Sequence, residues 1–269
     1  MTGQEMRRRL HAGERVYGSA LTNASAWAIP NYPELDFVFI DNEHCPLGRE
    51  STMTLCQGYK AHGVVPVVRI PIADPILACK TIDAGANGII CPYMEDPGLV
   101  REMVGAVKYR PLKGEKLSAF LKDGSGVEPV TLKYLNKKNK DNILIINVES
   151  VPAMNRLEEL VAVDGLDAVL IGPNDLSISL NIPDEFENPK FIAAAEKIIA
   201  TARAAGIGGG IHYWDSFDRE RQYVQKGANL IVHASDVGEA AKAINGALGS
   251  LRKEFGDVKS GAASESEVI

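Results

Sequence analysis

The sequence has none of the cysteine patterns that mark a disulfide framework or a structural zinc site. Its four cysteines (Cys45, Cys56, Cys79 and Cys91) form no C-x-x-C pair and have no histidine at zinc-finger spacing. Such wide spacing favours reduced thiols. The N-terminal stretch MTGQEMRRRLHAGERVYG lacks the apolar centre of a signal peptide, and no apolar run reaches the length of a membrane span. We therefore expect a cytoplasmic protein.

Basic clusters are also missing. The chain has 29 Lys and Arg residues against 35 Asp and Glu residues, a net charge of −6, and its basic residues do not cluster with aromatic ones. Nucleic acids and anionic membranes bind to basic patches. The sequence therefore predicts neither as a partner, which leaves small molecules and other protein chains.

Short runs rich in Val, Ile and Ala recur along the chain and predict strands. There are eight: Val16–Leu21, Asp36–Asp41, Val64–Ile70, Gly88–Pro92, Ile143–Glu149, Ala168–Gly172, Gly206–His212 and Asn229–Ala234. Helical candidates lie between them, at 48–63, 74–86, 151–165, 189–206 and 215–228. Apolar strands that alternate with amphipathic helices indicate a parallel sheet covered by helices. Eight such units match the count of a (β/α)8 TIM barrel in the α/β class.

A doubly wound open sheet is the alternative architecture, but no G-x-G-x-x-G motif follows the first predicted strand. We expect a single barrel domain over residues 1–255. The last residues, 256–269, read GDVKSGAASESEVI and are small, polar and acidic. This composition predicts a tail that is flexible or that contacts a neighbouring subunit.

Ionisable residues gather where the predicted strands end, which is where (β/α)8 barrels carry their catalytic groups. Glu149 ends the fifth strand and Asp175 follows the sixth. Each could be an inert helix N-terminal charge or cap. Together, however, two carboxylates on adjacent strands suit a hard divalent cation, Mg²⁺ or Mn²⁺, with Co²⁺ as a further candidate.

The second and third strands also end in polar groups. Arg69 interrupts an otherwise apolar strand, so its guanidinium either pairs with a neighbouring acid or clamps an anionic substrate. Asp41 and His44 are three residues apart and could form a pair in which the carboxylate orients the imidazole. We interpret His212 and His233, near the ends of later strands, as packed or hydrogen-bonded core histidines outside the site.

Five segments together resemble the HpcH/HpaI aldolases, a family of metal-dependent pyruvate aldolases. They are FVFIDNEHCP, VVPVVRIP, DAGANGIICPYMEDP, INVESVPAMNRLEEL and VDGLDAVLIGPNDLS, and the match extends from about Val16 to Ala243. The resemblance implies a homo-oligomer, a hexamer or trimer, in which each barrel's last helix packs on a neighbouring subunit.

The resemblance also implies roles for individual residues. The metal carboxylates fall on Glu149 and Asp175, the catalytic Asp and His on Asp41 and His44, and the arginine at the keto oxygen on Arg69. Gly172, Pro173 and Asn174 fall in the substrate-binding loop. One departure concerns Leu112 to Gly126, where Glu115 and Lys116 replace the family's Arg-Gly pair in a loop that helps to close the barrel mouth.

The expected activity is reversible cleavage of a 4-hydroxy-2-oxo acid to pyruvate, or a close 2-oxo acid, and an aldehyde. Two alternatives stay open. One is a citrate-lyase-like enzyme that cleaves a carbon-carbon bond in an acyl-CoA substrate on the same scaffold. The other is a barrel that binds a metabolite without catalysis.

The predicted strands contain no lysine, which predicts that catalysis does not proceed through an imine. An imine-forming aldolase needs a lysine with a lowered pKa inside the barrel. Borohydride added in the presence of pyruvate should therefore leave the protein mass unchanged. A reduced pyruvyl adduct in the mass spectrum would contradict the assignment to the metal-dependent class.

Overall fold

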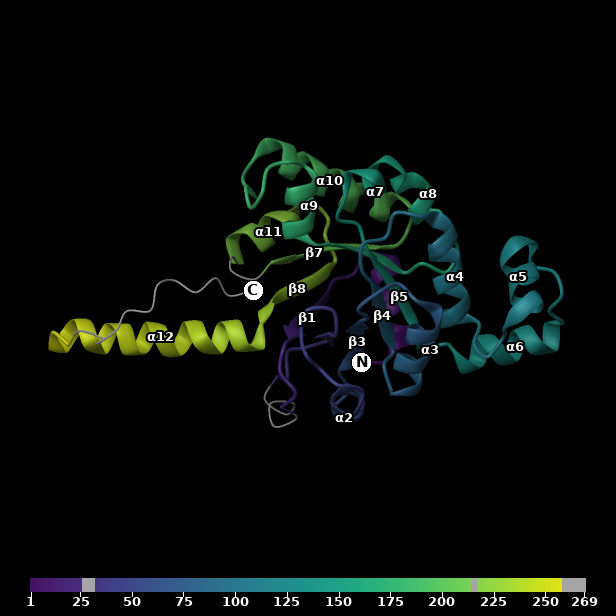
Figure 1. The fold of residues 1–269 in the computed structure, drawn as a ribbon, viewed down its shortest axis with the longest axis horizontal. Helices are drawn as coiled ribbons and strands as arrows, with labels where there is room; N and C mark the ends of the chain where they lie inside the picture. Colours follow the sequence, from purple (N-terminus) through teal and green to yellow (C-terminus); the bar gives the residue numbers. More distant parts are fainter. Residues whose placement is uncertain (26–31, 214–216, 258–269) are drawn as a thin grey trace.

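The computed structural model, which describes residues 1–25, 32–213 and 217–257, is a closed barrel of eight parallel strands (Figure 1). The strands pair in sequence order, and β8 closes the barrel on β1. Their bounds are Val16–Leu21 (β1), Phe37–Asp41 (β2), Val65–Arg69 (β3), Gly88–Cys91 (β4), Ile143–Asn147 (β5), Ala168–Ile171 (β6), Gly208–Tyr213 (β7) and Leu230–Ser235 (β8). The predicted (β/α)8 barrel is confirmed, and each strand overlaps its predicted range.

Helices alternate with the strands along the chain, and most of them cover the outside of the barrel. They are α1 (Gly3–Ala12), α2 (Arg49–Ala61), α3 (Pro75–Asp83), α4 (Pro97–Lys108), α5 (Gly114–Asp123), α6 (Pro129–Lys138), α7 (Val151–Asn155), α8 (Leu157–Val161), α9 (Pro173–Ser179), α10 (Pro189–Ala204), α11 (Phe217–Gln225) and α12 (Asp236–Phe255). The predicted segment 151–165 forms two short helices, α7 and α8, and part of 215–228 lies outside the described residues.

Alternate residues of each strand point into the barrel. The inner layer is apolar and consists of side chains such as Phe37, Phe39, Val67, Ile145 and Leu170, and a second apolar cluster fills the space between strands and helices. Gly18 makes room for the Phe37 ring, with which a Cβ at position 18 would collide. Because direction alternates with period two, Asp41 and Arg69 point to the same side as Phe39 and Val67, into the barrel.

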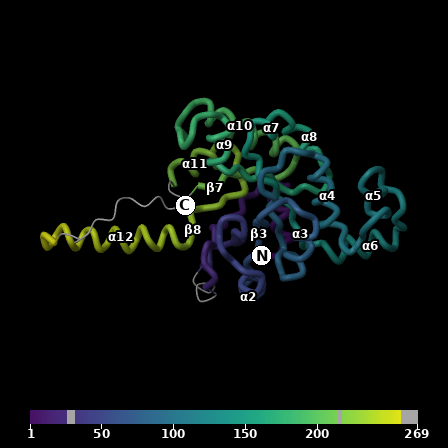
Figure 2. The backbone as a smooth tube through the Cα atoms, viewed as in Figure 1, coloured from purple at the N-terminus to yellow at the C-terminus, as the bar shows by residue number. Residues whose placement is uncertain are grey.

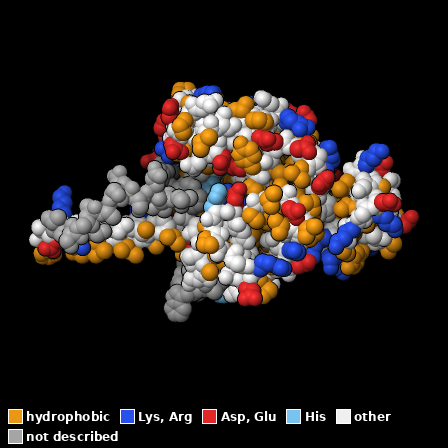
Figure 3. Space-filling model, in the orientation of Figure 1, with side chains coloured by type: hydrophobic (Ala, Val, Ile, Leu, Met, Phe, Trp, Pro, Cys, Tyr) orange, Lys and Arg blue, Asp and Glu red, His pale blue; other side chains and the backbone are white. Residues whose placement is uncertain are grey.

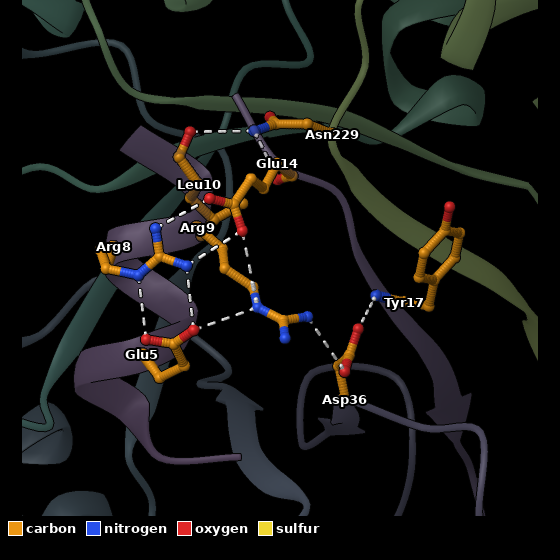
Figure 4. A network of polar contacts seen from close by, with 8 residues as sticks. All are labelled: Glu5, Arg8, Arg9, Leu10, Glu14, Tyr17, Asp36 and Asn229. Carbon is orange, nitrogen blue, oxygen red and sulfur yellow. Dashed lines mark hydrogen bonds and ion pairs between the residues drawn. The ribbon is translucent and has the colours of Figure 1, made fainter. Parts of the chain in front are cut away.

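Helix α1 closes the barrel at the N-terminal ends of the strands, where Met6 and Leu10 enter the inner apolar cluster. Arg8 bridges Glu5 and Glu14, and Arg9 lies 3.3 Å from Glu5 and 3.8 Å from Asp36 (Figure 4). These pairs are partly exposed and contribute little individually. Of these pairs, only Arg9 with Asp36 links α1 to the start of β2.

The segment Leu112 to Gly126 packs on the outer side of α4, away from the mouth of its own barrel. It forms most of α5, which packs on the end of α4 through an edge-to-face contact between Tyr109 and Phe120 at 4.8 Å. Helix α4 runs back from the mouth to the N-terminal ends of the strands. Within a single chain this segment therefore does not close the mouth of the barrel, and the expectation that it does is wrong. Figure 2 shows α5 and α6 standing out from the barrel side.

Helix α12 leaves the barrel and projects into solvent (Figures 1 and 3). Its large exposed apolar side chains are Val237, Ile244, Leu248, Leu251 and Phe255. Their spacing of three, four and seven residues places them on one face. Most of the predicted tail, residues 258–269, lies outside the described residues. Among the described helices, none has the length and apolarity required to cross a membrane.

A buried ion pair at the barrel base should contribute strongly to stability. Lys108, from α4, contacts Asp167, and its Nζ donates to the Asn142 carbonyl at 2.7 Å, with the two side chains 9% and 2% exposed. Lys108→Met leaves the Asp167 charge buried without its partner, so the free energy of unfolding should fall by about 3–5 kcal/mol. Urea denaturation measures this loss.

The matched control is Lys197→Met. Lys197 lies 3.9 Å from Glu158, and both side chains are more than half exposed. Its loss should change the free energy of unfolding by less than about 1 kcal/mol. Equal effects for the two variants would mean that burial of the Lys108 pair is not what stabilises the base.

Candidate active site

Asp41 and Arg69 form the centre of the polar site at the C-terminal ends of the strands. They are direct partners in the β2–β3 register. Arg69 Nε donates to Asp41 Oδ1 at 2.9 Å and Nη2 donates to Oδ2 at 2.7 Å, so the pair is bidentate. Burial opposes both charges, but the pairing prevails: the pKa of Asp41 lies below its usual range and that of Arg69 above it. Both groups are therefore charged at neutral pH.

Glu43 is a second acid against the same guanidinium. Its Oε2 lies 3.0 Å from Arg69 Nη1, and its side chain is 23% exposed. Burial raises the pKa of Glu43, although the charge of Arg69 acts in the opposite direction. The two hydrogen bonds to Asp41 use two of the five N–H donors of a guanidinium. Arg69 thus keeps donors for a ligand oxygen.

The predicted pairing of the Asp41 carboxylate with the His44 imidazole is not what the structure shows. Asp41 Oδ1 accepts the backbone N–H groups of Glu43, at 3.0 Å, and of His44, at 3.4 Å. The imidazole of His44 instead has its Nε2 3.6 Å from Glu43 Oε2. Arg69 forms two hydrogen bonds with the Asp41 carboxylate. This pairing follows from the β2–β3 register, which the sequence spacing of Asp41 and His44 does not reveal.

Glu149 follows β5 and is almost fully buried, at 3% exposure. Its Oε1 accepts the backbone N–H of Tyr93 at 2.8 Å. Its Oε2 is buried and has no hydrogen-bond partner among the residues that the structure describes. Burial raises the pKa of Glu149 to about 7, and the charge of Asp175 adds to the shift. A buried acid with one oxygen unsatisfied is suited to receive a cation.

Asp175 lies in the first turn of α9, three residues after its N-cap Gly172, and is exposed. Its charge acts on the pKa values of Glu149, Glu43 and Tyr93, so these groups share one site. Of the predicted substrate-binding residues, Gly172 lies directly against Glu149 Oε2 and Pro173 is buried. Asn174 turns its amide to Asp184 at 3.0 Å.

The donor set fits a divalent cation. Glu149 offers a buried oxygen without a partner and Asp175 offers an exposed carboxylate beside it. No group of three or more His, Cys, Asp or Glu side chains at metal-binding geometry occurs within residues 1–25, 32–213 and 217–257. A cation here would take two protein carboxylates and complete its shell with water and substrate oxygens, as Mg²⁺ often does.

The sequence interpretation missed Asn147 and Tyr93. Asn147 is the last residue of β5 and points inward below Glu149; its amide donates to the Leu170 carbonyl at 3.1 Å, while its Oδ1 is buried without a partner among the described residues. A polar residue in the aliphatic run ILIIN was the available signal. Tyr93 has φ 48° and is placed by its backbone contact with Glu149, for which the sequence carries no signal.

The two histidines left out of the site have different environments. His212 is buried in the barrel, with Nε2 3.2 Å from the Ala234 carbonyl and its ring edge-to-face with Phe39. Burial lowers the pKa of His212 to about 4. This matches the prediction of a core histidine. His233 is exposed and pairs with Glu220 at 2.7 Å, so its assignment to the core was wrong.

Known proteins resemble this chain in sequence and fold. The family model for HpcH/HpaI aldolase/citrate lyase matches residues 19–243. A hydroxypyruvate/pyruvate aldolase of Sagittula stellata is 32% identical, covering 75% of this chain and 80% of the relative. A 4-hydroxy-2-oxo-heptane-1,7-dioate aldolase of Salmonella heidelberg is 29% identical over 82% and 84% of the two chains. The crystal structure of an HpcH/HpaI aldolase from Desulfitobacterium hafniense has a TM-score of 0.80 and 26% identity, covering 92% and 96%.

The contact between Gly172 and Glu149 yields a prediction. A Cβ at position 172 would collide with Glu149 Oε2, so Gly172→Ala should displace the carboxylate. Mn²⁺ affinity, measured by electron paramagnetic resonance, should fall by about 10–100-fold, which is the usual effect of mutating a residue that orients a metal ligand. Gly48→Ala is the control, since a Cβ there meets nothing within 4 Å. Unchanged Mn²⁺ affinity in a folded Gly172→Ala variant would exclude Glu149 Oε2 as a ligand.

Proposed function

Since this chain belongs to the HpcH/HpaI aldolase/citrate lyase family, we propose that it is a divalent-metal-dependent aldolase that reversibly cleaves a 4-hydroxy-2-oxo acid to pyruvate, or a close 2-oxo acid, and an aldehyde. Relatives named hydroxypyruvate/pyruvate aldolase and 4-hydroxy-2-oxo-heptane-1,7-dioate aldolase support this carbon-carbon lyase activity. The single observation in the structure that supports it most is the buried Oε2 of Glu149, which has no hydrogen-bond partner among the described residues.

Glu149 and Asp175 would hold the cation, Mg²⁺ or Mn²⁺ with Co²⁺ as a further candidate. A bound divalent cation polarises the keto group of a 2-oxo acid and stabilises the negative charge that develops on its oxygen. Glu149 binds it as the carboxylate, because metal ligands must be deprotonated. With its pKa near 7, this acid loses its proton readily when a cation arrives.

Arg69 binds the keto oxygen of the substrate. Its guanidinium is held rigidly by Asp41 and is 8% exposed, so its remaining donors face the site in a fixed direction and with little competing water. Donors fixed in advance stabilise charge without reorganisation during the reaction. Gly172, Pro173 and Asn174, at the start of α9, would line the same pocket.

His44 takes the proton from the 4-hydroxyl group in the cleavage direction. Its imidazole is 57% exposed at the mouth, where a substrate can reach it. As the O–H proton moves to His44, the C3–C4 bond breaks, the aldehyde leaves and the electron pair passes to the 2-oxo acid as its enolate. Protonation at C3 then gives pyruvate. In the reverse direction His44 returns the proton to the new hydroxyl group.

The functional unit we propose is a homo-oligomer in which α12 packs on a neighbouring subunit. The row Val237, Ile244, Leu248, Leu251 and Phe255 exposes apolar area that a second copy could bury. A hexamer or trimer fits this arrangement. Within this unit, residues 1–255 form the catalytic domain, 256–269 the tail, and the cytoplasm is the proposed compartment.

The proposed function predicts strict dependence on the cation. The purified protein should release pyruvate from a 4-hydroxy-2-oxo acid, lose the activity in EDTA and regain it with Mg²⁺ or Mn²⁺. Glu149→Gln and Asp175→Asn should reduce cleavage to background and keep the fold, because few protein groups hold the cation. A lactate dehydrogenase assay measures pyruvate, and circular dichroism checks the fold.

Asp164→Asn is the matched control, since Asp164 is an exposed carboxylate beside Tyr109 at the opposite end of the barrel. It should keep full activity. Full activity of protein shown to be metal-free would overturn the metal dependence. Cleavage of an acyl-CoA substrate in place of the 4-hydroxy-2-oxo acid would favour the citrate-lyase-like alternative, and binding of 2-oxo acids without cleavage would favour the non-catalytic one.

A further inference from the structure

A cavity of about 730 Å³ lies beside the N-terminal ends of β6 and β7, at the opposite end of the barrel from the candidate active site. Its walls come from α1, α4, α6 and the loops that lead into β6 and β7. The volume falls within the range of about 300–1,000 Å³ that small-molecule sites occupy. Among the described residues that line it, none belongs to the proposed reaction, so that reaction does not explain its polar groups.

Arg7, on α1, lines the cavity and is half-buried, and it has no hydrogen bond or ion pair with any residue in the described part of the chain. Its neighbours Arg8 and Arg9 both contact carboxylates (Figure 4). The other buried or half-buried arginines of the described ranges also have acceptors; with Arg9 they are Arg69, Arg110, Arg203 and Arg219. Burial without a partner deprives a guanidinium of hydrogen bonds that water would make. Arg7 therefore keeps donors for a ligand in the cavity.

Lys108, at the end of α4, supplies a second donor. Its side chain is 9% exposed, and its Nζ contacts Asp167 and donates to the Asn142 carbonyl at 2.7 Å. An ammonium group has three N–H donors, so one remains. Burial lowers the pKa of Lys108; the charge of Asp167 opposes this shift and the charge of Arg7 adds to it. The two cations are therefore close enough to repel each other, and an anion bound beside both would offset that repulsion.

The charges around the cavity favour an anionic ligand. Its bases are Arg7, Lys108 and Lys140, and its acids are Asp164 and Asp167. Asp167 is already occupied by Lys108 and, at 3.3 Å, by His11. With His11 neutral, the cavity carries one positive charge in excess, in a chain whose net charge is −6. A concave surface with an excess of one sign of charge attracts ligands of the other sign.

A smaller neighbouring cavity, of about 440 Å³, has the opposite balance. Its bases are Arg101 and Lys122, and its acids are Asp123, Glu159 and Asp164. Anion binding is therefore expected in the larger cavity and not in this one, and Arg101 offers a matched control.

We propose that the larger cavity is a binding site for a small anionic metabolite whose carboxylate or phosphate group accepts from Arg7 and Lys108. A guanidinium can bind either group through two parallel hydrogen bonds. Lys140, which is exposed, adds positive charge to the same cavity. The inference does not rest on the proposed function, because this site and the candidate active site share no residue.

Isothermal titration calorimetry with two probes, inorganic phosphate and succinate, tests the site and shows which of the two groups it prefers. Arg7→Gln should weaken binding of the preferred probe by about 10–100-fold, since a hydrogen bond from a charged group is lost. Arg7→Lys should weaken it less, because the charge stays while the planar fork is lost. The melting temperature of Arg7→Gln should not fall, since the substitution removes no contact within the described chain.

Two further variants complete the test. Lys140→Gln removes an exposed cation of the same cavity, which leaves the fold intact, and should weaken binding by a few-fold. Arg101→Gln should bind as the wild-type protein does. An unchanged affinity in Arg7→Gln would place the anion elsewhere, for example at Arg69, and would overturn the inference. Failure of the wild-type protein to bind either probe would overturn it too. If Arg7→Gln does not fold, an unchanged affinity in Lys140→Gln has the same consequence.

Discussion

The buried Arg69 guanidinium is the constraint around which the polar site is arranged. A positive charge that is 8% exposed inside a barrel is tolerated only when anions and hydrogen-bond acceptors surround it. Asp41, its register partner, supplies a bidentate contact, and Glu43 supplies a second carboxylate at 3.0 Å. Asp41 also accepts the backbone N–H of His44, while the imidazole of that residue lies 3.6 Å from Glu43.

Much of the fold could be predicted from the sequence because the barrel repeats one simple pattern. Eight apolar runs with helices between them leave few other architectures, and the strand bounds deviate by at most two residues at either end. Helices α5 and α6 were not predicted, because they replace a loop that the family resemblance places at the mouth. Their position depends on where α4 ends, which is a tertiary feature that no local motif encodes.

The residues of the candidate site could be predicted from the sequence, but the side chains with which they pair could not. Asp41, His44, Arg69, Glu149 and Asp175 all lie at the mouth, as strand-end positions dictate. Sequence spacing favoured Asp41 with His44, yet residues on neighbouring strands pair through register, and register places Asp41 opposite Arg69. Tyr93 contributes a backbone N–H, a group that every residue except proline carries, so the sequence offers no signal for it.

Two buried acids at opposite ends of the barrel, Asp167 and Glu149, differ in how their carboxylate oxygens are satisfied. At the base, Asp167 receives Lys108, the Leu144 N–H at 2.8 Å and His11 at 3.3 Å, so its charge is fully compensated. At the mouth, Glu149 Oε2 and Asn147 Oδ1 are buried without partners among the described residues. Leaving such atoms unsatisfied costs stability, at about 1–3 kcal/mol each. Asp167 shows that this fold can satisfy both oxygens of a buried acid, and a ligand that binds at the mouth would remove the cost at Glu149.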